Sequence, residues 1–180
     1  MINSGWGSLQ LGSTVHCVSA LEQGGFADVV LTLENDEKVP VHRSILLARS
    51  GVFREWLMDP SVKEKRISGP PALVKEVIKY FYSGMPPEDL ESIAMELLPV
   101  AYQYVAGKLR QMCVHALRRI LTMDNLVDIL ILSETNECPE LFSFCLPFYK
   151  ANAKRLKPDD KEKLKANPGL LLRLAEGCAE

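Results

Sequence analysis

Apolar residues follow two different patterns along this 180-residue chain. Near the start, two short apolar runs, residues 29–33 and 38–41, flank the polar turn residues 34–37. Runs of this length around a polar turn predict a β-hairpin. From residue 42 onward the apolar positions recur at helical spacing instead. The pattern therefore predicts an α+β fold, with a small early sheet flanked and followed by helices.

Capping and helix-breaking residues set the bounds of the expected helices. Ser13 begins a short helix that stops at Gly24, and Ser50 begins another after the hairpin. Pro71 fits the first turn of a further helix, which Gly84 closes. The full set of expected helices is 13–23, 42–50, 52–58, 71–83, 91–105, 108–121, 126–135, 139–152 and a pair within 157–180 joined at 167–169.

Pro99 falls inside the expected helix 91–105. A proline there removes the N–H that would bond to the Met95 carbonyl and crowds that carbonyl. Two alternatives follow from the sequence. Either the helix begins close to Pro99, or it is kinked at that point.

The charge of the chain is nearly balanced, with a formal net charge of −2. Such a surface offers no electrostatic basis for binding nucleic acid or an anionic membrane. The first residues lack the basic and apolar segments of a signal peptide, and residues 1–12 are expected to be poorly ordered. No apolar run approaches the ~18 residues of a membrane-spanning helix.

The five cysteines are odd in number and scattered, so a disulfide framework is not expected. We interpret the thiols as reduced, which fits the nucleus or the cytoplasm. Cys113 and His115 point to different sides of a helix, so they form no metal site together, and we expect a buried thiol beside a surface imidazole. Motifs for phosphate loops, nucleophile elbows and zinc proteases are missing from the sequence. No catalytic residue, metal or cofactor is therefore assigned.

Two features close to the hairpin attract attention. His42 follows the second strand and has no partner at a catalytic or metal-binding spacing, so a structural role is favoured. Trp56, Leu57 and Met58 end a short helix beside a charged loop, and Tyr104 ends a later helix. Large aromatic side chains near a loop suit either the core or a protein-binding groove, and periodicity alone favours the core at any one position.

Taken together, these segments resemble the BTB/POZ domain family. The resemblance rests on an ordered set of motifs rather than on one of them. These motifs are "FADVVLTL…VPVHRSILLARSGVF" in residues 26–53, "VIKYFYSG" in 77–84 and "ELLPVAYQYVAGKLRQMCVHAL" in 96–117, with "LVDILILSE" and "NPGLLLRLAE" further on. The last two look most like the speckle-type POZ protein group.

The resemblance implies a BTB/POZ domain over residues 13–121 and a helical extension, of the 3-box or partial BACK type, over residues 122–180. It also implies a homodimer, or pairing with a related BTB protein. Asp28 and Arg43 match two charged residues near the dimer groove of the family, and a structural ion pair is the alternative for them. The dimer face implied by the resemblance consists of Val15, Val18, Leu21 and Ile45.

The speckle-type group also implies docking of the cullin-3 N-terminal region. Its hydrophobic-x-Glu motif matches Val62 and Glu64, with Met58 and Tyr104 on the same surface. Val62 stands among charged residues, so it is either an anchor for the partner or folds back onto the core. Too few residues precede Asp28 for the substrate-selecting β-sandwich (MATH domain) of that group, so this domain is expected to be absent and the substrate is left open.

The resemblance therefore leads to an adaptor that joins a cullin-3 ubiquitin ligase to an unidentified protein substrate. The alternative is a dimerisation scaffold, of the corepressor or regulatory kind, without cullin binding. An enzyme is disfavoured because the motifs for one are missing.

Overall fold

The computed structural model describes residues 19–21 and 23–179, with the side chains of the last two of these left out. Its described part divides into two compact units. The first comprises the described residues up to Glu88 together with Val100–Arg110, and the second comprises Asp89–Pro99 and Gln111 onward. The expected domain boundary after residue 121 stays a prediction.

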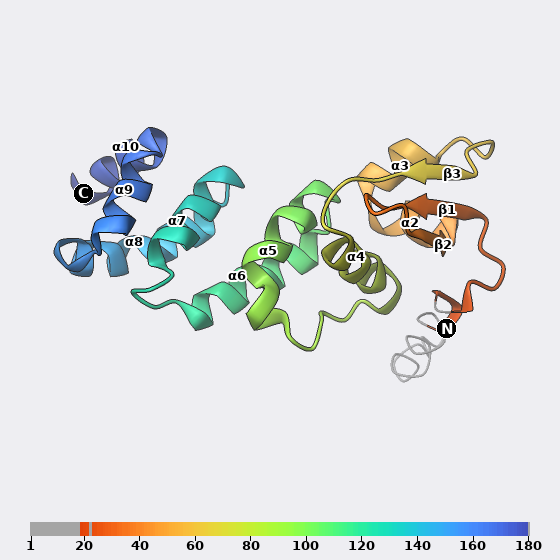
Figure 1. Cartoon of the computed structure of the whole chain (residues 1–180), viewed down its shortest axis with the longest axis horizontal. Coiled ribbons are helices and arrows are strands. Elements are labelled where there is room, and N and C mark those ends of the chain that lie inside the picture. The colour runs from red at the N-terminus through yellow and green to blue at the C-terminus, as the bar shows by residue number, and fades with distance from the viewer. Residues whose placement is uncertain (1–18, 22, 180) are drawn as a thin grey trace, which may run out of the picture. The chain divides into compact units, whose positions relative to one another are not determined.

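A three-stranded sheet forms the β part of the first unit, with β1 between β2 and β3 (Figure 1). Strands β1 (Val29–Thr32) and β2 (Lys38–Val41) are antiparallel, which confirms the predicted hairpin. Strand β3 (Glu64–Arg66) runs parallel to β1. The sequence pattern missed β3, because all three of its residues are charged.

Both outer strands of this sheet present edges that are poor at pairing. Pro40 of β2 lies opposite Val30, and Val30 donates its N–H to Lys63 on the β3 side. The Pro40 nitrogen therefore faces the open edge, where its missing N–H breaks no bond of the sheet. The other edge is formed by the short, charged β3.

Most helices lie close to the ranges expected from the sequence (Figure 1). Helix α5 begins at Leu90 and continues through Pro99, so the helix does not begin at the proline. Residues 19–21 and 23 are helical and end before Gly24, as expected, whereas the predicted start at Ser13 lies outside the described residues. The helical segments that follow are α2 (Arg43–Arg49), α3 (Gly51–Leu57), α4 (Pro71–Ser83), α5 (Leu90–Gln103), α6 (Gly107–Ile120), α7 (Leu126–Thr135), α8 (Pro139–Asn152), the 3₁₀ turn η1 (Ala153–Arg155), α9 (Pro158–Lys165) and α10 (Pro168–Ala179).

The core of the first unit collects the apolar faces of the sheet and of helices α2 to α4. Burying these side chains removes apolar area from water, which is the main favourable contribution to folding. In α4 the sequence pattern predicts an apolar stripe of Leu73, Val77, Ile78 and Phe81, and all four side chains are buried. The fully buried large side chains of this unit include Leu31, Leu33, Leu46, Phe53, Leu57, Ile78, Phe81 and Tyr104.

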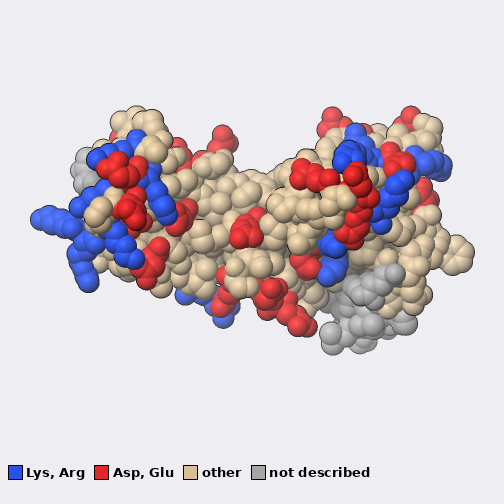
Figure 2. Space-filling view, viewed as in Figure 1, with Lys and Arg blue, Asp and Glu red and all other residues tan. Residues whose placement is uncertain are grey.

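The second unit is helical, and α7 packs against α8, α9 and α10. Ion pairs join α7 to its neighbours, with Asp128 bonded to Lys163 of α9 and Glu134 bonded to Arg173 of α10. On the face drawn in Figure 2, acidic and basic side chains of this unit are interleaved. This interleaving agrees with the balanced net charge of the sequence.

The cysteines with described side chains, Cys113, Cys138 and Cys145, are free and buried. Burial raises the pKa of the Cys113 thiol to about 12 and that of Cys145 to about 11. These thiols therefore stay protonated at neutral pH and pack as small apolar groups. The imidazole of His115 is exposed, as expected. Among the described residues no cluster of His, Cys, Asp and Glu side chains could hold a metal, and none of the described helices is long and apolar enough to cross a bilayer.

Candidate partner-binding loop and the polar network that holds it

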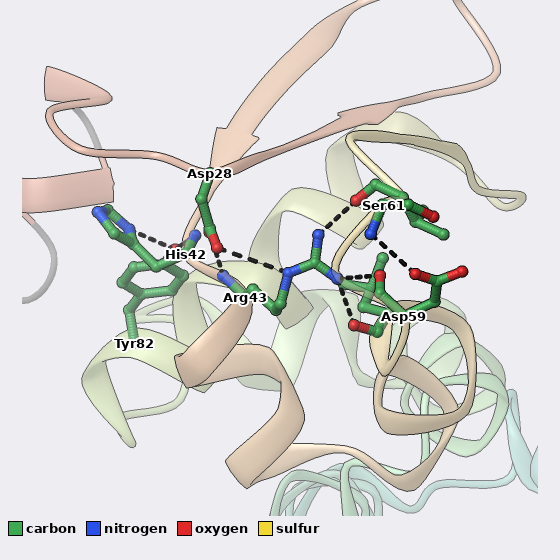
Figure 3. Close-up of polar contacts among 8 residues, drawn as sticks. Asp28, His42, Arg43, Asp59, Ser61 and Tyr82 are labelled. Carbon is green, nitrogen blue, oxygen red and sulfur yellow. Dashed lines mark hydrogen bonds and ion pairs between the residues drawn. The ribbon is translucent and has the colours of Figure 1, made fainter.

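His42 is the residue that precedes α2, and it connects three parts of the first unit. Figure 3 shows its contact with Tyr82. Its Nε2 lies 2.9 Å from the Gly25 carbonyl oxygen, and its Nδ1 lies 2.9 Å from the Tyr82 hydroxyl. A carbonyl only accepts, so Nε2 carries the proton. The Tyr82 oxygen also accepts the His42 backbone N–H at 2.7 Å. Both ring nitrogens of His42 therefore have partners within the subunit, which fits the structural role predicted for His42.

Asp28 and Arg43 form the ion pair that the sequence offered as one alternative (Figure 3). Asp28 Oδ2 lies 3.5 Å from Arg43 Nε, and Oδ1 accepts the Arg43 backbone N–H at 2.8 Å. Since Arg43 is the first residue of α2, the carboxylate also lies at the positive end of that helix. The pair therefore joins the start of β1 to the start of α2. A place at a dimer groove stays a prediction.

The Arg43 guanidinium has a second set of partners, which the sequence did not indicate. Nη1 donates to the carbonyl oxygen of Leu57, the last residue of α3, and to that of Asp59 at 2.8 Å. Nη2 donates to the carbonyl oxygen of Val62. The Arg43 side chain is only 11% exposed. One guanidinium thus binds three backbone carbonyls across residues 57–62.

Residues 58–63 connect α3 to β3, and we call them the 58–63 loop. A local turn shapes it, in which Asp59 Oδ1 accepts the Ser61 N–H at 2.8 Å and the Asp59 carbonyl accepts the Val62 N–H at 3.2 Å. The hydrogen bond from Ser61 lowers the pKa of the Asp59 carboxyl. At its end the loop is fixed to β1, because the Lys63 carbonyl accepts the Val30 N–H at 2.9 Å.

The predicted cullin-binding residues occupy different environments in and near this loop. Met58 is 73% exposed and Val62 is half-buried. Glu64 is exposed but lies in β3, where it accepts a 2.7 Å hydrogen bond from Thr32 and pairs with Lys38 at 3.0 Å. The Thr32 hydrogen bond, followed by the one from Lys38, lowers the pKa of the Glu64 carboxyl. The structure thus places Met58 and Val62 on one short loop, with Glu64 just beyond it.

Tyr104 does not border an open surface, and this part of the prediction is corrected. Its side chain is fully buried, stacks on Phe53 with ring centroids 5.4 Å apart, and donates its hydroxyl hydrogen to the Ser68 carbonyl. Burial raises the pKa of the Tyr104 phenol to about 12. The Tyr104 carbonyl accepts a 2.6 Å hydrogen bond from Ser50, the predicted cap of α3. Internal partners therefore explain why this ring faces inward.

Trp56 is the aromatic residue that lies at a surface here. It is half-buried, meets Tyr104 edge-on at 6.3 Å, and has the Lys65 ammonium 5.1 Å from its ring. An open hollow of about 430 Å³ lies beside it, and its other lining residues come mainly from the β3 region. The residues that line the hollow are Glu34, Trp56, Lys65, Arg66, Ile67 and Ser68. The sequence indicated this surface by an aromatic residue beside a charged loop. The hollow itself could not be predicted, because β3 residues line it and the sequence pattern missed β3.

The predicted dimer face is described only in part. Val15 and Val18 lie outside the described residues. Leu21 is half-buried and lines a hollow of about 220 Å³ with β2 and α4 residues, including Pro40 and Ile78. Ile45 is half-buried on α2. A role for Leu21 or Ile45 in self-association therefore stays a prediction.

The first unit thus combines a small three-stranded sheet with helices and a polar network around His42 and Arg43 at the start of α2. Comparison with known proteins identifies the family of this fold. The family model of the BTB/POZ domain matches residues 18–121, which is more than half of the chain. The chain therefore belongs to the BTB/POZ domain family, and the resemblance found in the sequence is confirmed.

Individual relatives support the same assignment. The chain is 27% identical over 189 aligned residues to BTB/POZ and MATH domain-containing protein 4 of Arabidopsis thaliana, an alignment that covers 92% of this chain and 40% of that protein. Among solved structures, the BTB domain of zebrafish PATZ1 matches with a TM-score of 0.54 at 18% identity, covering 65% of this chain and 99% of that one. The BTB domain of human Gigaxonin matches with a TM-score of 0.51 at 21% identity, covering 64% and 98%. The last two show the fold alone.

Proposed function

We propose that this chain is a dimeric, non-enzymatic adaptor that binds cullin-3 and brings a protein substrate, or a related BTB protein, to a ubiquitin ligase in the nucleus or the cytoplasm. The observation that supports this most directly is the 58–63 loop. It combines an exposed Met58 and a half-buried Val62 with a backbone fixed by Arg43 and β1. A loop whose backbone is already held in place loses less conformational entropy on binding than a free one does.

The hollow beside Trp56 adds to this proposal. Interfaces are usually dominated by a few aromatic or apolar anchors that fill pockets in the partner or accept anchors from it. Trp56 and Ile67 line a hollow of about 430 Å³ next to the strand that follows the 58–63 loop. In the proposed complex, Met58 and Val62 insert into the cullin, while the hollow receives one of its side chains. The helices after residue 121 would add a second contact, as the resemblance to the speckle-type group implies.

One observation favours the alternative, a BTB scaffold without cullin binding. The Glu64 carboxylate already bonds to Thr32 and Lys38 within the chain. A partner that needs this carboxylate has to compete with those bonds. If Glu64→Gln binds cullin-3 with unchanged affinity, the adaptor proposal stands, and Glu64 stabilises the sheet instead of contacting the partner.

Calorimetric titration of the purified chain with the cullin-3 N-terminal domain tests the proposal. We expect saturable binding, which Met58→Asp and Val62→Asp each weaken by about tenfold or more, equal to ~1.4 kcal/mol. Lys63→Asp, an exposed change in the same loop, serves as the control for charge. Absence of binding by the well-folded wild-type chain would reject the adaptor in favour of the scaffold. Unfolding of Val62→Asp, with Met58→Asp binding normally, would show that Val62 belongs to the core and that the loop is not the contact.

A further inference from the structure

We propose that Arg43 is a positioning residue, which sets the conformation of the 58–63 loop and thereby places Met58 and Val62 for the partner. The inference rests on the proposed function for the identity of the partner. It assigns to Arg43 a task different from that of a charged residue at a dimer groove. The observation behind it is the convergence of three loop carbonyls on one guanidinium (Figure 3).

The geometry uses a property that only arginine has. A guanidinium carries five N–H donors in a rigid planar fork. In Arg43 one edge of the fork faces the Asp28 carboxylate, and the two terminal nitrogens face the carbonyls of Leu57, Asp59 and Val62. A lysine ammonium is a compact charge on a flexible stem and cannot span these acceptors together.

The loop has little burial of its own to fix its shape. All of its residues except Val62 are exposed. Apart from the Arg43 bonds, the contacts that shape its middle are the Asp59 side-chain bond to Ser61 and the Asp59 carbonyl bond to Val62. Because the guanidinium also binds the Asp59 carbonyl, it fixes the residue on which both of these contacts depend. Removing Arg43 is therefore expected to loosen the loop while leaving the sheet and core in place.

The Asp28 carboxylate takes part in the same arrangement from the other side. It holds the Arg43 backbone N–H at 2.8 Å and lies 3.5 Å from Nε, so it orients the side chain toward the loop. The two carboxylates around this guanidinium are Asp28 and Asp59, and the Asp59 carboxyl oxygen is engaged with Ser61. Neutralising Asp28 is expected to reproduce a weaker form of the Arg43 defect. Because residues at the starts of β1 and α2 hold the loop, substitutions at the start of α2 are also expected to alter the partner-binding surface.

Two measurements on the full chain test the inference. The first is hydrogen exchange at the Ser61 and Val62 amides, whose bonds depend on the placement of Asp59. The second is calorimetric affinity for the cullin-3 N-terminal domain. For Arg43→Met we expect exchange at both amides to rise by about tenfold and affinity to fall by about tenfold, with exchange in α4 unchanged. Arg43→Lys should fall between wild type and Arg43→Met.

Arg54→Met is the matched control, because Arg54 also donates its guanidinium to a backbone carbonyl, that of Leu47, but not to the loop. It should leave both measurements unchanged. Equal exchange at Ser61 and Val62 in wild type and a folded Arg43→Met would overturn the inference, and so would a uniform rise that includes α4. If Arg43→Met does not fold, Arg43→Lys decides on the same criterion. Failure of wild type to bind cullin-3 would reject the proposed function, while the exchange data would still decide the role of Arg43.

Discussion

Replacing Tyr104 by phenylalanine tests the environment that the structure assigns to this side chain. The substitution keeps the ring that stacks on Phe53 and removes only the hydroxyl that donates to the Ser68 carbonyl. One hydrogen bond contributes about 1 kcal/mol to the free energy of unfolding. The Ser68 carbonyl keeps a second donor, Gln103 Nε2 at 3.3 Å, which limits the damage. We expect Tyr104→Phe to be about 1 kcal/mol less stable than wild type at neutral pH.

The difference should change sign in alkali. The pKa of Tyr104 is raised from 10.0 to about 12 in the folded chain, because burial disfavours the phenolate. The folded state therefore holds this proton more tightly than the unfolded state does. The raised pKa of Tyr104 contributes to the free energy of unfolding fully below pH 10. This contribution is lost as pH rises toward 12, by about 1.4 kcal/mol for each pH unit. Wild type loses the ~1 kcal/mol by which it exceeds the variant somewhat less than one pH unit above pH 10. The two proteins should therefore be equally stable near pH 11.

Urea unfolding between pH 7 and 11.5 under reducing conditions measures this crossing. Tryptophan fluorescence is the appropriate signal, since Trp56 lies edge-on to the Tyr104 ring. Other titrating groups affect both proteins alike and cancel in the difference. A stability difference that stays constant over this pH range would refute the burial of the phenol. A loss of 3 kcal/mol or more at neutral pH, about the size of a core cavity, would show that the ring does not stay in place.

Three further predictions concern the frame around the site. His42→Ala removes the ring that bridges Gly25 and Tyr82, and should lower the free energy of unfolding by about 2 kcal/mol while removing no chemical activity, as melting and solubility would show. Gly69→Ala should destabilise by about 1 kcal/mol or more, because Gly69 has φ of +113° and its new Cβ would lie 3.1 Å from Val74, whereas Gly51→Ala meets nothing within 4 Å and should be neutral in the same melting experiment. The double variant Leu21→Asp, Ile45→Asp should shift sedimentation from dimer to monomer, and a wild-type chain that is monomeric at tens of micromolar would contradict the dimer.

Periodicity was sufficient for the hairpin and most helices because their apolar faces are local features of the sequence. Strand β3 was not accessible in this way. Glu64 and Arg66 are exposed, and what makes the segment a strand is pairing with β1, a backbone interaction that no side-chain pattern encodes. The path of α5 through Pro99 was left open for a similar reason, because tertiary packing decides whether a helix tolerates a proline.

The candidate site was predictable in its residues more than in its contacts. The ion pair of Asp28 with Arg43 was one of two alternatives, since opposite charges imply a pair but not its surroundings. The three carbonyls bound by Arg43 could not be predicted, because every residue has a backbone carbonyl and the sequence does not show which of them accepts a side-chain donor. Tyr104 was assigned to a surface because the resemblance to the speckle-type group implied it, although periodicity alone favoured the core. Only the structure shows the Ser68 carbonyl that accepts its hydroxyl.

The edges of the small sheet bear on how the protein behaves when concentrated. An open strand edge is a template for misassembly, since any extended segment from another molecule can add to it. Pro40 takes a donor from one edge, and the other edge offers three charged residues, Glu64, Lys65 and Arg66. Crowded molecules of this kind are therefore expected to meet through side-chain surfaces and to resist growth into fibrils. In the proposed adaptor, which would act in an assembly, these two edges would help to keep the chain from aggregating.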